Sequence, residues 1–586
     1  MTGLFAKLAT IWRIASPYFR SEDRWPGRLL LAGLIIIELS IVGINVLLNA
    51  WNNDFYNALQ DKNWDAFVYQ LGYFSILAGL LIVLQVYQLY LNQWLQIRWR
   101  RWLTQRYLDK WLSSANHYRM QLLGDSADNP DQRIAEDVKQ FIDGGPSQLG
   151  VLTIGLGLLN AIVTLASFVA ILWKLSEAAP LHLFDSVWAI PGYLVWAALI
   201  YAVFGTVLTH LVGWPLVSLN FRQQRFEADF RFNLVRTREN SEQIALLEGE
   251  PAEQTRILET FGRVVANWRL IMTRTKQLTL LTTSYAQVSI IFPFIVASPA
   301  YFAGAVQLGG LMQISSAFGS VQNALSFFIN VYRGMAEWRA VVDRLDGFDR
   351  SIEAARAVAV TPPVIAVTPG DAASVTFKDL AVRLPNGAPL VAANEIAIGV
   401  GDRVLVSGPS GSGKSTLFRA LSGIWPFGSG TIIVPKNAKV MMLPQRPYFP
   451  IAPLAAAIAY PAEPGSFDNA KVAALIESVG LPGLASRVEE EAHWNRMLSL
   501  GEQQRLGIAR AILHAPDYLF LDEATASLDE PAEAELYKLL ADRLGAATIV
   551  SIGHRSTLAA FHRRRLAFNR EGDHYALREG SLKAGA

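Results

Sequence analysis

Nine residues in the second half of the chain read Gly408-Pro409-Ser410-Gly411-Ser412-Gly413-Lys414-Ser415-Thr416. They follow a short apolar, β-prone segment, Asp402–Val406, and match G-x-x-x-x-G-K-[ST] between a strand and a helix. Glycines let backbone N–H groups curl around phosphate oxygens, and the N-terminus of the next helix favours negative charge. Lys414 would neutralise the β- and γ-phosphates, and Ser415 would ligate Mg²⁺. The stretch predicts an α/β P-loop NTPase domain that binds ATP and Mg²⁺, with Gly408 and residues 410–416 around the phosphates.

A second chemical feature lies downstream, where the apolar run Tyr518–Leu521 ends in Asp522 and Glu523. A buried strand would deliver Asp522 to the magnesium ion and Glu523 to a water in line with the γ-phosphorus. Hydrolysis of a phosphoanhydride needs a metal ligand and a base side by side. We therefore expect Glu523 to be the general base.

Between these elements lies Leu498-Ser499-Leu500-Gly501-Glu502-Gln503-Gln504-Arg505, which resembles the signature of the ABC ATPases. Other motifs of that family follow the same order: Gln445 resembles the Q-loop glutamine, Ser527-Leu528-Asp529 the D-loop, and His554 the switch histidine. The resemblance implies catalytic roles for Gln445 and His554, and a place for Gln445 beside the metal. It also implies a head-to-tail dimer in which Ser499 and Gly501 of one subunit complete the γ-phosphate site of the other, with Asp529 among the nucleotide-binding residues.

Two positions depart from the family pattern. Leu500 stands where many members have glycine, although Ser499 and Gly501 remain. The region that usually offers an aromatic ring to adenine reads Ala381-Val382-Arg383-Leu384-Pro385 and has no tyrosine. Arg383 or Leu384 is expected to take that place.

The composition places the rest of the chain in a membrane. At 586 residues the chain is too long for one compact core, and it is 52% hydrophobic but only 17% charged. The formal net charge is only +2, so the chain as a whole has no strong positive field that would attract nucleic acid. Nucleic acid is therefore not expected as a partner. Since there is no cysteine, disulfides, thiolate metal sites and thiol catalysis are excluded.

The first half carries six apolar stretches of the length that crosses hydrocarbon, about 20 residues. They lie near residues 29–50, 70–92, 149–173, 187–212, 279–306 and 309–332. Arginine-rich segments at 98–106 and 222–238 follow the second and fourth stretches, so the positive-inside rule puts both termini in the cytoplasm and Trp51–Trp64 outside. Before the first span, apolar residues at helical spacing predict an amphipathic elbow helix on the membrane surface.

Two cytoplasmic stretches are candidates for contact with the ATPase domain. Asp128–Asp131 supplies turn and cap chemistry before a helix at Gln132–Phe141, and Glu239–Glu250 is a second acidic helical stretch. Solvated charged faces are the alternative for both.

Polar side chains within the spans form stripes that either line an aqueous cavity or join helices by hydrogen bonds. Glu38, Asn45 and Asn49 share one stripe of the first span. The stripes of the second and sixth spans contain Gln85, Gln88, Asn92, Gln313, Ser316, Ser320 and Asn323. The candidate cavity residues are Glu38, Asn45, Gln85, Gln88, Gln313 and Asn323. Glu38 is the strongest, because a carboxylate near mid-membrane is expensive and should face water or protein.

These features predict a polytopic α-helical membrane domain with six transmembrane helices at 1–355, a proline-rich linker at 356–373 and the ATPase domain at 374–586. One ATPase unit and six spans imply a half-transporter with an exporter-like ABC fold that works as a homodimer.

Finer motifs resemble two related groups. Gly423-Ile424-Trp425-Pro426 and Leu443–Tyr448 look like the ATPase of the ABC D subfamily. Trp51–Leu59, Asn129–Ile134 and Glu239-Asn240 resemble the SbmA/BacA peptide-uptake proteins. The resemblance implies import of peptides or other hydrophilic solutes across the bacterial inner membrane, with the ATPase domain in the cytoplasm. A lipid or acyl-CoA transporter and a membrane sensor switched by ATP remain as alternatives.

Overall fold

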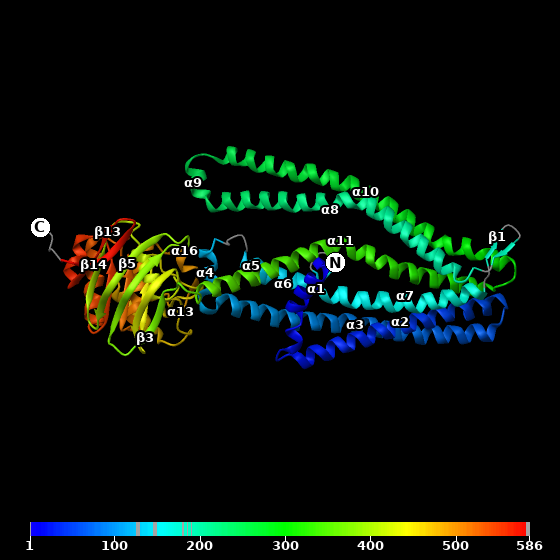
Figure 1. Ribbon diagram of the computed structural model, residues 1–586, viewed down its shortest axis with the longest axis horizontal. Coiled ribbons are helices and arrows are strands. Elements are labelled where there is room, and N and C mark those ends of the chain that lie inside the picture. Colours follow the sequence, from blue (N-terminus) through cyan, green and yellow to red (C-terminus); the bar gives the residue numbers. More distant parts are fainter. Residues whose placement is uncertain are drawn as a thin grey trace. The chain divides into compact units, whose positions relative to one another are not determined.

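The computed structural model describes the chain apart from Met1 and residues 125–128, 145–148, 179–180, 184–185, 189 and 582–586. The chain divides into two compact units (Figure 1). The first comprises residues 1–108 and 129–348, and the second comprises residues 109–128 and 349–586. The second unit therefore takes a short segment from the first half of the chain.

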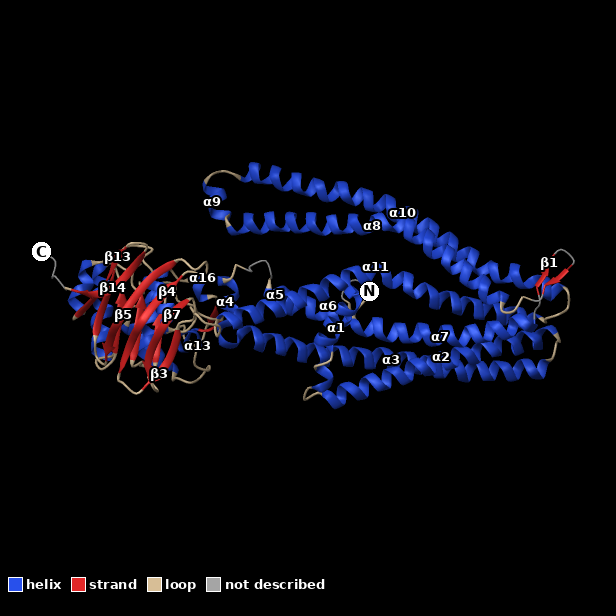
Figure 2. Cartoon of the chain, viewed as in Figure 1, coloured by secondary structure: helices blue, strands red, loops and turns tan. Residues whose placement is uncertain are grey.

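The first unit is built from long helices (Figure 2). They are α2 (Arg24–Gln60), α3 (Trp64–Leu112), α7 (Val151–Ala178), α8 (Tyr193–Glu239), α10 (Glu250–Phe302) and α11 (Leu308–Val358). Within the described residues, all but α11 are long and apolar enough to cross a membrane. The sixth predicted span falls on α11, where Gln313, Gln322 and Asn323 interrupt the apolar residues.

Shorter elements join these helices. They include α1 (Thr2–Ala15), α5 (Pro130–Gln132), α6 (Val138–Asp143), α9 (Ser241–Leu246), and the hairpin of β1 (Leu181–Leu183) and β2 (Ser186–Trp188). Most of the stretch Trp51–Trp64, expected as an external loop, is helical, since α2 continues to Gln60 and α3 begins at Trp64. A π-helical turn, Arg133–Asp137, interrupts the helix expected at Gln132–Phe141, and Asp128 lies outside the described residues.

Helices α8 and α10 form a long antiparallel pair joined through α9 (Figure 1). Toward the β1–β2 end, Tyr201 and Tyr285 stack at 4.5 Å, and each hydroxyl donates to the other's backbone carbonyl. Toward α9, buried Asn267 donates to the Leu219 carbonyl at 3.0 Å and to Gln223 at 2.9 Å. Buried hydrogen bonds from a side-chain amide, such as these, fix the register of the two helices.

The second unit contains a ten-stranded sheet in the order β3-β7-β4-β5-β14-β13-β6-β12-β11-β8. Its strands are β3 (Ala366–Gly370), β4 (Ser374–Arg383), β5 (Pro389–Gly399), β6 (Arg403–Ser407), β7 (Gly428–Pro435), β8 (Val440–Leu443), β11 (Tyr518–Asp522), β12 (Thr548–Ile552), β13 (Arg564–Glu571) and β14 (His574–Gly580). A two-stranded sheet pairs β9 (Ala452–Pro453) with β10 (Glu491–Ala492). Strands β6, β12, β11 and β8 are parallel, so their carboxyl ends share one edge.

Helices cover the sheet of the second unit. They are α4 (Asn116–Leu122), α12 (Lys414–Leu421), α13 (Leu454–Ala459), α14 (Asn469–Ser478), α15 (Pro482–Ala485), α16 (Trp494–Met497), α17 (Leu500–His514) and α18 (Glu530–Arg543). Two apolar clusters form the core: one includes Leu519, Leu521 and Ile549, the other Phe520 and Val550. Neighbouring residues of β11 alternate between the clusters, as side chains on a strand buried on both faces must.

Candidate ATP-hydrolysis site

The predicted phosphate loop connects β6 to α12, in the strand–loop–helix context that the motif requires. Gly411 and Gly413 have φ of +78° and +92°, a conformation that disfavours any residue with a Cβ. At Gly413 a Cβ would also lie 2.5 Å from Val391. Ser410 and Gly411 are exposed at the loop surface, whereas Thr416 lies in the first turn of α12.

Lys414 folds back onto its own loop. Its Nζ donates to the carbonyls of Gly408 at 2.9 Å and Pro409 at 2.8 Å, and the residue is only 6% exposed. Burial lowers the pKa of Lys414, and the charges of Glu523 and Asp522 act in the opposite direction. A γ-phosphate would supply the negative charge that this buried ammonium needs.

One buried polar atom of the loop has no partner in the described structure: the Ser412 hydroxyl, on a residue that is 0% exposed. An orphan hydroxyl inside a loop beside a helix N-terminus fits a bound phosphate oxygen. The loop therefore fits ATP.

Ser415 donates from Oγ to Asp522 Oδ1 at 2.8 Å, so the start of α12 and the end of β11 meet here. Burial raises the pKa of Asp522, and the Ser415 hydrogen bond lowers it in part. Over the described residues, no group of three His, Cys, Asp or Glu side chains could hold a metal. The pair of oxygens from Ser415 and Asp522 fits Mg²⁺, because this ion keeps several waters and uses one or two protein oxygens together with phosphate.

The three predicted catalytic side chains meet at one point. Glu523 Oε2 accepts from Gln445 Nε2 at 3.2 Å, and Glu523 Oε1 lies 3.2 Å from His554 Nε2. The backbone of Glu523 has φ of +50°, and its N–H donates to the Ile552 carbonyl on β12. Such a strained residue persists only when its surroundings fix it, and here two side chains hold the carboxylate of Glu523 while β12 holds its backbone N–H.

The signature residues lie elsewhere on the same unit. Ser499 is the N-cap of α17 and forms a capping box with Glu502, and Asp529 is the N-cap of α18. At Gly501 a Cβ would lie 3.3 Å from Leu528. In the described structure, no hydrogen bond joins Ser499, Gly501 or Asp529 to residues 408–416. Within the described structure, the single chain therefore brings together the predicted catalytic residues, and separately the predicted phosphate loop, without the signature residues.

The segment expected beside adenine follows β4. The guanidinium of Arg383 donates to the Gly387 carbonyl at 3.1 Å, and the Arg383 carbonyl accepts from Trp425. Arg383 is exposed and Leu384 half-buried. Base contact by either residue stays a prediction.

Sequence reasoning missed α4. Arg119 on this helix donates to the Gly423 carbonyl at 3.0 Å and to the Ser114 carbonyl at 2.6 Å. Leu122 packs against the apolar core of the sheet. The two contact candidates expected from sequence were Gln132–Phe141 and Glu239–Glu250, whereas this contact uses an earlier segment with no strong charge or turn pattern.

Among the polar residues of the spans, Glu38 is held by two amides. It is 7% exposed, accepts from Gln88 of α3, and accepts from Asn160 of α7 at 2.8 Å. Sequence reasoning missed Asn160, which lies in a strongly apolar helix. Asn49 donates to the Gln313 backbone carbonyl at 3.0 Å.

The other candidate cavity residues are not drawn into this cluster. Asn45, Gln85 and Asn323 are exposed, and within the described part of the chain none of the three has a hydrogen-bonded side chain. A shared cargo surface formed by these residues therefore stays a proposal.

The comparisons with known proteins agree with this site. Residues 14–302 match the family model "ABC transporter transmembrane region 2", and residues 394–526 match the model "ABC transporter". The chain is 32% identical to the inner membrane ABC transporter ATP-binding protein YddA of Escherichia coli, over 92% of this chain and 94% of YddA. It is also 32% identical to ABC transporter D family member 2, chloroplastic, of Arabidopsis thaliana, over 95% and 86%.

More distant relatives extend the comparison. The human lysosomal cobalamin transporter ABCD4 is 26% identical over 87% of this chain and 86% of its own length. Among solved structures, a bacterial Atm1-family ABC exporter with ATP bound aligns with a TM-score of 0.70 at 18% identity, covering 95% of each chain. At this low identity, the similarity to the Atm1-family structure shows the fold alone.

These findings confirm the predictions of an exporter-like ABC fold, an ATP-hydrolysing translocase and a bacterial inner-membrane location with a cytoplasmic ATPase domain. The chain belongs to the ABC transporter family, as a transmembrane region fused to an ATPase domain and related to the ABC D subfamily.

Proposed function

We propose that this transporter works as a homodimer that imports peptides or other hydrophilic solutes, in the manner of the SbmA/BacA proteins. The observation that carries the proposal is the Glu38 cluster. It places a carboxylate and two carboxamides from three helices within the apolar part of the membrane unit. A lipid pathway has no need of such groups, which are costly in hydrocarbon. The name of the ABCD4 relative, a cobalamin transporter, indicates that this architecture also serves a large polar cargo.

The signature supports the homodimer. Ser499, Gly501 and Asp529 make no hydrogen bond to the phosphate loop of their own described chain, so a second copy would supply them. The tip of the α8–α10 pair also carries exposed Leu246 and Leu247, at 76% and 81%. Apolar side chains grouped at an exposed tip favour burial against another surface. Two-fold symmetry would make both ATP sites equivalent.

The chemistry at each site follows from the residues described. Glu523 accepts the proton of the attacking water, while Gln445 and His554 hold its carboxylate in place. Lys414 and the backbone N–H groups of the loop stabilise charge on the phosphates. Mg²⁺, held by Ser415 and Asp522, would supply further neutralisation of the phosphate charge when bound.

Uptake of labelled compounds by cells tests this proposal. We would compare a cationic peptide, cobalamin and a fatty acyl-CoA in cells with wild-type protein, Glu523→Gln or no protein. We expect uptake of peptide or cobalamin only in cells that contain the protein. The rate of this uptake should fall at least ~10²-fold with Glu523→Gln, because that substitution removes the general base of ATP hydrolysis. Stimulation of ATP hydrolysis by acyl-CoA alone would instead favour lipid transport. Hydrolysis with no flux of any compound would favour a sensor.

A further inference from the structure

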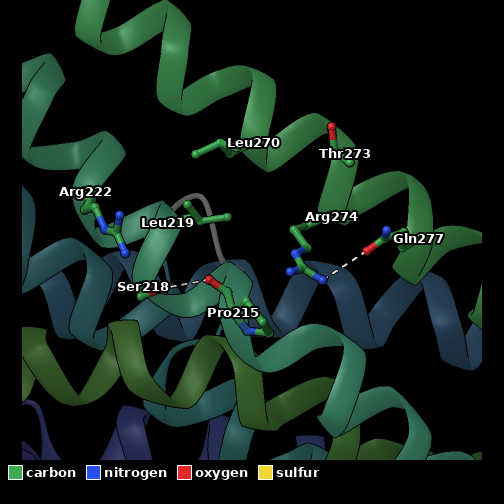
Figure 3. A pocket seen from close by; sticks show the side chains of 8 residues that line it. All are labelled: Pro215, Ser218, Leu219, Arg222, Leu270, Thr273, Arg274 and Gln277. Carbon is green, nitrogen blue, oxygen red and sulfur yellow. Dashed lines mark hydrogen bonds between the residues drawn. The ribbon is translucent and has the colours of Figure 1, made fainter.

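A cavity of about 390 Å³ lies between α8 and α10 (Figure 3). This volume falls in the range of small-molecule sites, ~300–1,000 Å³. The lining residues are Pro215, Ser218, Leu219, Arg222, Leu270, Thr273, Arg274 and Gln277. None of them belongs to the ATP site or to the Glu38 cluster.

The cavity has two cationic walls and an apolar centre. Figure 3 shows Arg222 of α8 and Arg274 of α10 on opposite sides, with Leu219 and Leu270 between them. Arg274 donates to Gln277 at 3.2 Å. Arg222 has no hydrogen bond or ion pair in the described structure. The guanidinium donors of both side chains are therefore largely free for an anion.

The surrounding charge strengthens this character. Residues 263–277 of α10 carry three arginines and one lysine and no acidic residue. On α8, residues 222–231 carry three arginines against Glu227 and Asp229, and Glu227 accepts a hydrogen bond from Gln223. Among the described residues that line the cavity, none carries a carboxylate. Arginine matches the geometry of phosphate through its planar fork of donors.

The position along the helices places the cavity at the cytoplasmic surface of the bilayer. Pro215 lies three residues after the apolar stretch that ends at 212 on α8, and Gln277 lies two residues before the stretch that begins at 279 on α10. Trp214 and Trp268 are both more than half exposed, as is typical of residues at the interface. On the membrane side, Leu211 and Leu280 are 66% and 69% exposed. A ligand with a phosphate at the arginines and apolar chains along these leucines fits the surface.

We propose that this cavity binds the phosphate headgroup of an anionic lipid of the cytoplasmic leaflet, between Arg222 and Arg274. Basic pockets between transmembrane helices on the cytoplasmic side suit such headgroups. The proposal does not depend on which cargo is transported.

Native mass spectrometry of the full chain in detergent tests the site. The protein is mixed with equal amounts of phosphatidylglycerol and phosphatidylcholine, and the lipids it retains are counted. The test variant is Arg222→Gln with Arg274→Gln. The matched control is Arg225→Gln with Arg263→Gln, which removes the same charge from the same two helices but from residues that do not line the cavity. Inorganic phosphate and glycerol 3-phosphate serve as soluble competitors.

We expect the wild type to prefer phosphatidylglycerol and the cavity variant to lose that preference by roughly fivefold for each arginine, while the control keeps it. Equal loss in both double variants, or no preference in the wild type, would overturn the proposal. Displacement of the lipid by either soluble competitor at equal concentration would also overturn it, because the site would then be one for soluble phosphates. If the double variant does not elute from a size-exclusion column as the wild type does, the two single variants replace it. Each single variant is expected to lose about fivefold of the preference for phosphatidylglycerol.

Discussion

Replacing Arg119 by methionine should detach α4 from the sheet of the ATPase unit. The guanidinium holds two carbonyls, those of Ser114 before the helix and Gly423 after α12. It is 8% exposed, and burial lowers the pKa of Arg119. Methionine keeps much of the apolar stem but donates to neither carbonyl.

The cost can be worked from these contacts. Hydrogen bonds to a charged group contribute ~1.5–3 kcal/mol each, so the two bonds give about 3 kcal/mol at the low end. The methionine side chain recovers about 1 kcal/mol through apolar burial. The net loss of about 2 kcal/mol corresponds to roughly 30-fold in the equilibrium between α4 folded on the sheet and α4 detached and unfolded, in which both bonds are broken.

Hydrogen exchange and transport together measure the effect. Amides 116–122 should exchange roughly 30-fold faster in Arg119→Met, and cargo uptake should fall while ATP hydrolysis continues. Arg487→Met is the control, since in the described structure its guanidinium pairs with exposed Glu490 and lies over the Trp494 ring, and it makes no hydrogen bond to α4. Exchange that is as slow in Arg119→Met as in the control would refute the reasoning.

Four further predictions concern single sites. Lys414→Ala should weaken ATP binding and abolish transport without unfolding, so ATP titration and circular dichroism should separate the two effects; surviving transport would require another energy source. Glu38→Gln should fold and hydrolyse ATP but lose uptake of cationic peptide, and unchanged uptake would leave Glu38 a packing residue. With no aromatic ring at 381–385, GTP should compete with ATP within roughly tenfold; a strong ATP preference in competition binding would show that another residue stacks on the base. Burial lowers the pKa of His562 below its ordinary ~6.5, so its contribution to stability should be full above about pH 6.5 and decline as the pH falls further. Urea midpoints at pH 7.5 and 5.5 should differ less in His562→Asn, and an equal shift in both would assign the pH dependence to other groups.

Local spacing made the fold around the phosphate loop predictable from the sequence. The phosphate loop must lie between a strand and a helix, and a buried strand must deliver Asp522 and Glu523 to the edge where that loop begins. The partners that lie far away in sequence could not be predicted in this way. Asn160 contacts Glu38 across 122 positions, and Arg119 contacts Gly423 across 304. Neither residue stands in a pattern that distinguishes it from its neighbours, so only the folded chain identifies the pairs.

Gly423 connects the phosphate loop to α4, because it follows the helix that begins in that loop and its carbonyl accepts a hydrogen bond from Arg119. Helix α12 begins at Lys414 in the phosphate loop, ends at Leu421, and is followed by Gly423 in a left-handed conformation. Its positive end lies at the phosphate loop, where a bound nucleotide would place negative charge, and its negative end lies next to Arg119, which is the favourable sign at that end. Eight residues span only about 12 Å. A γ-phosphate that displaced α12 would therefore also move the carbonyl that holds α4, and α4 directly continues the segment that leaves α3. Because α4 and α3 are joined through the chain, we expect the Arg119 substitution to separate ATPase activity from transport.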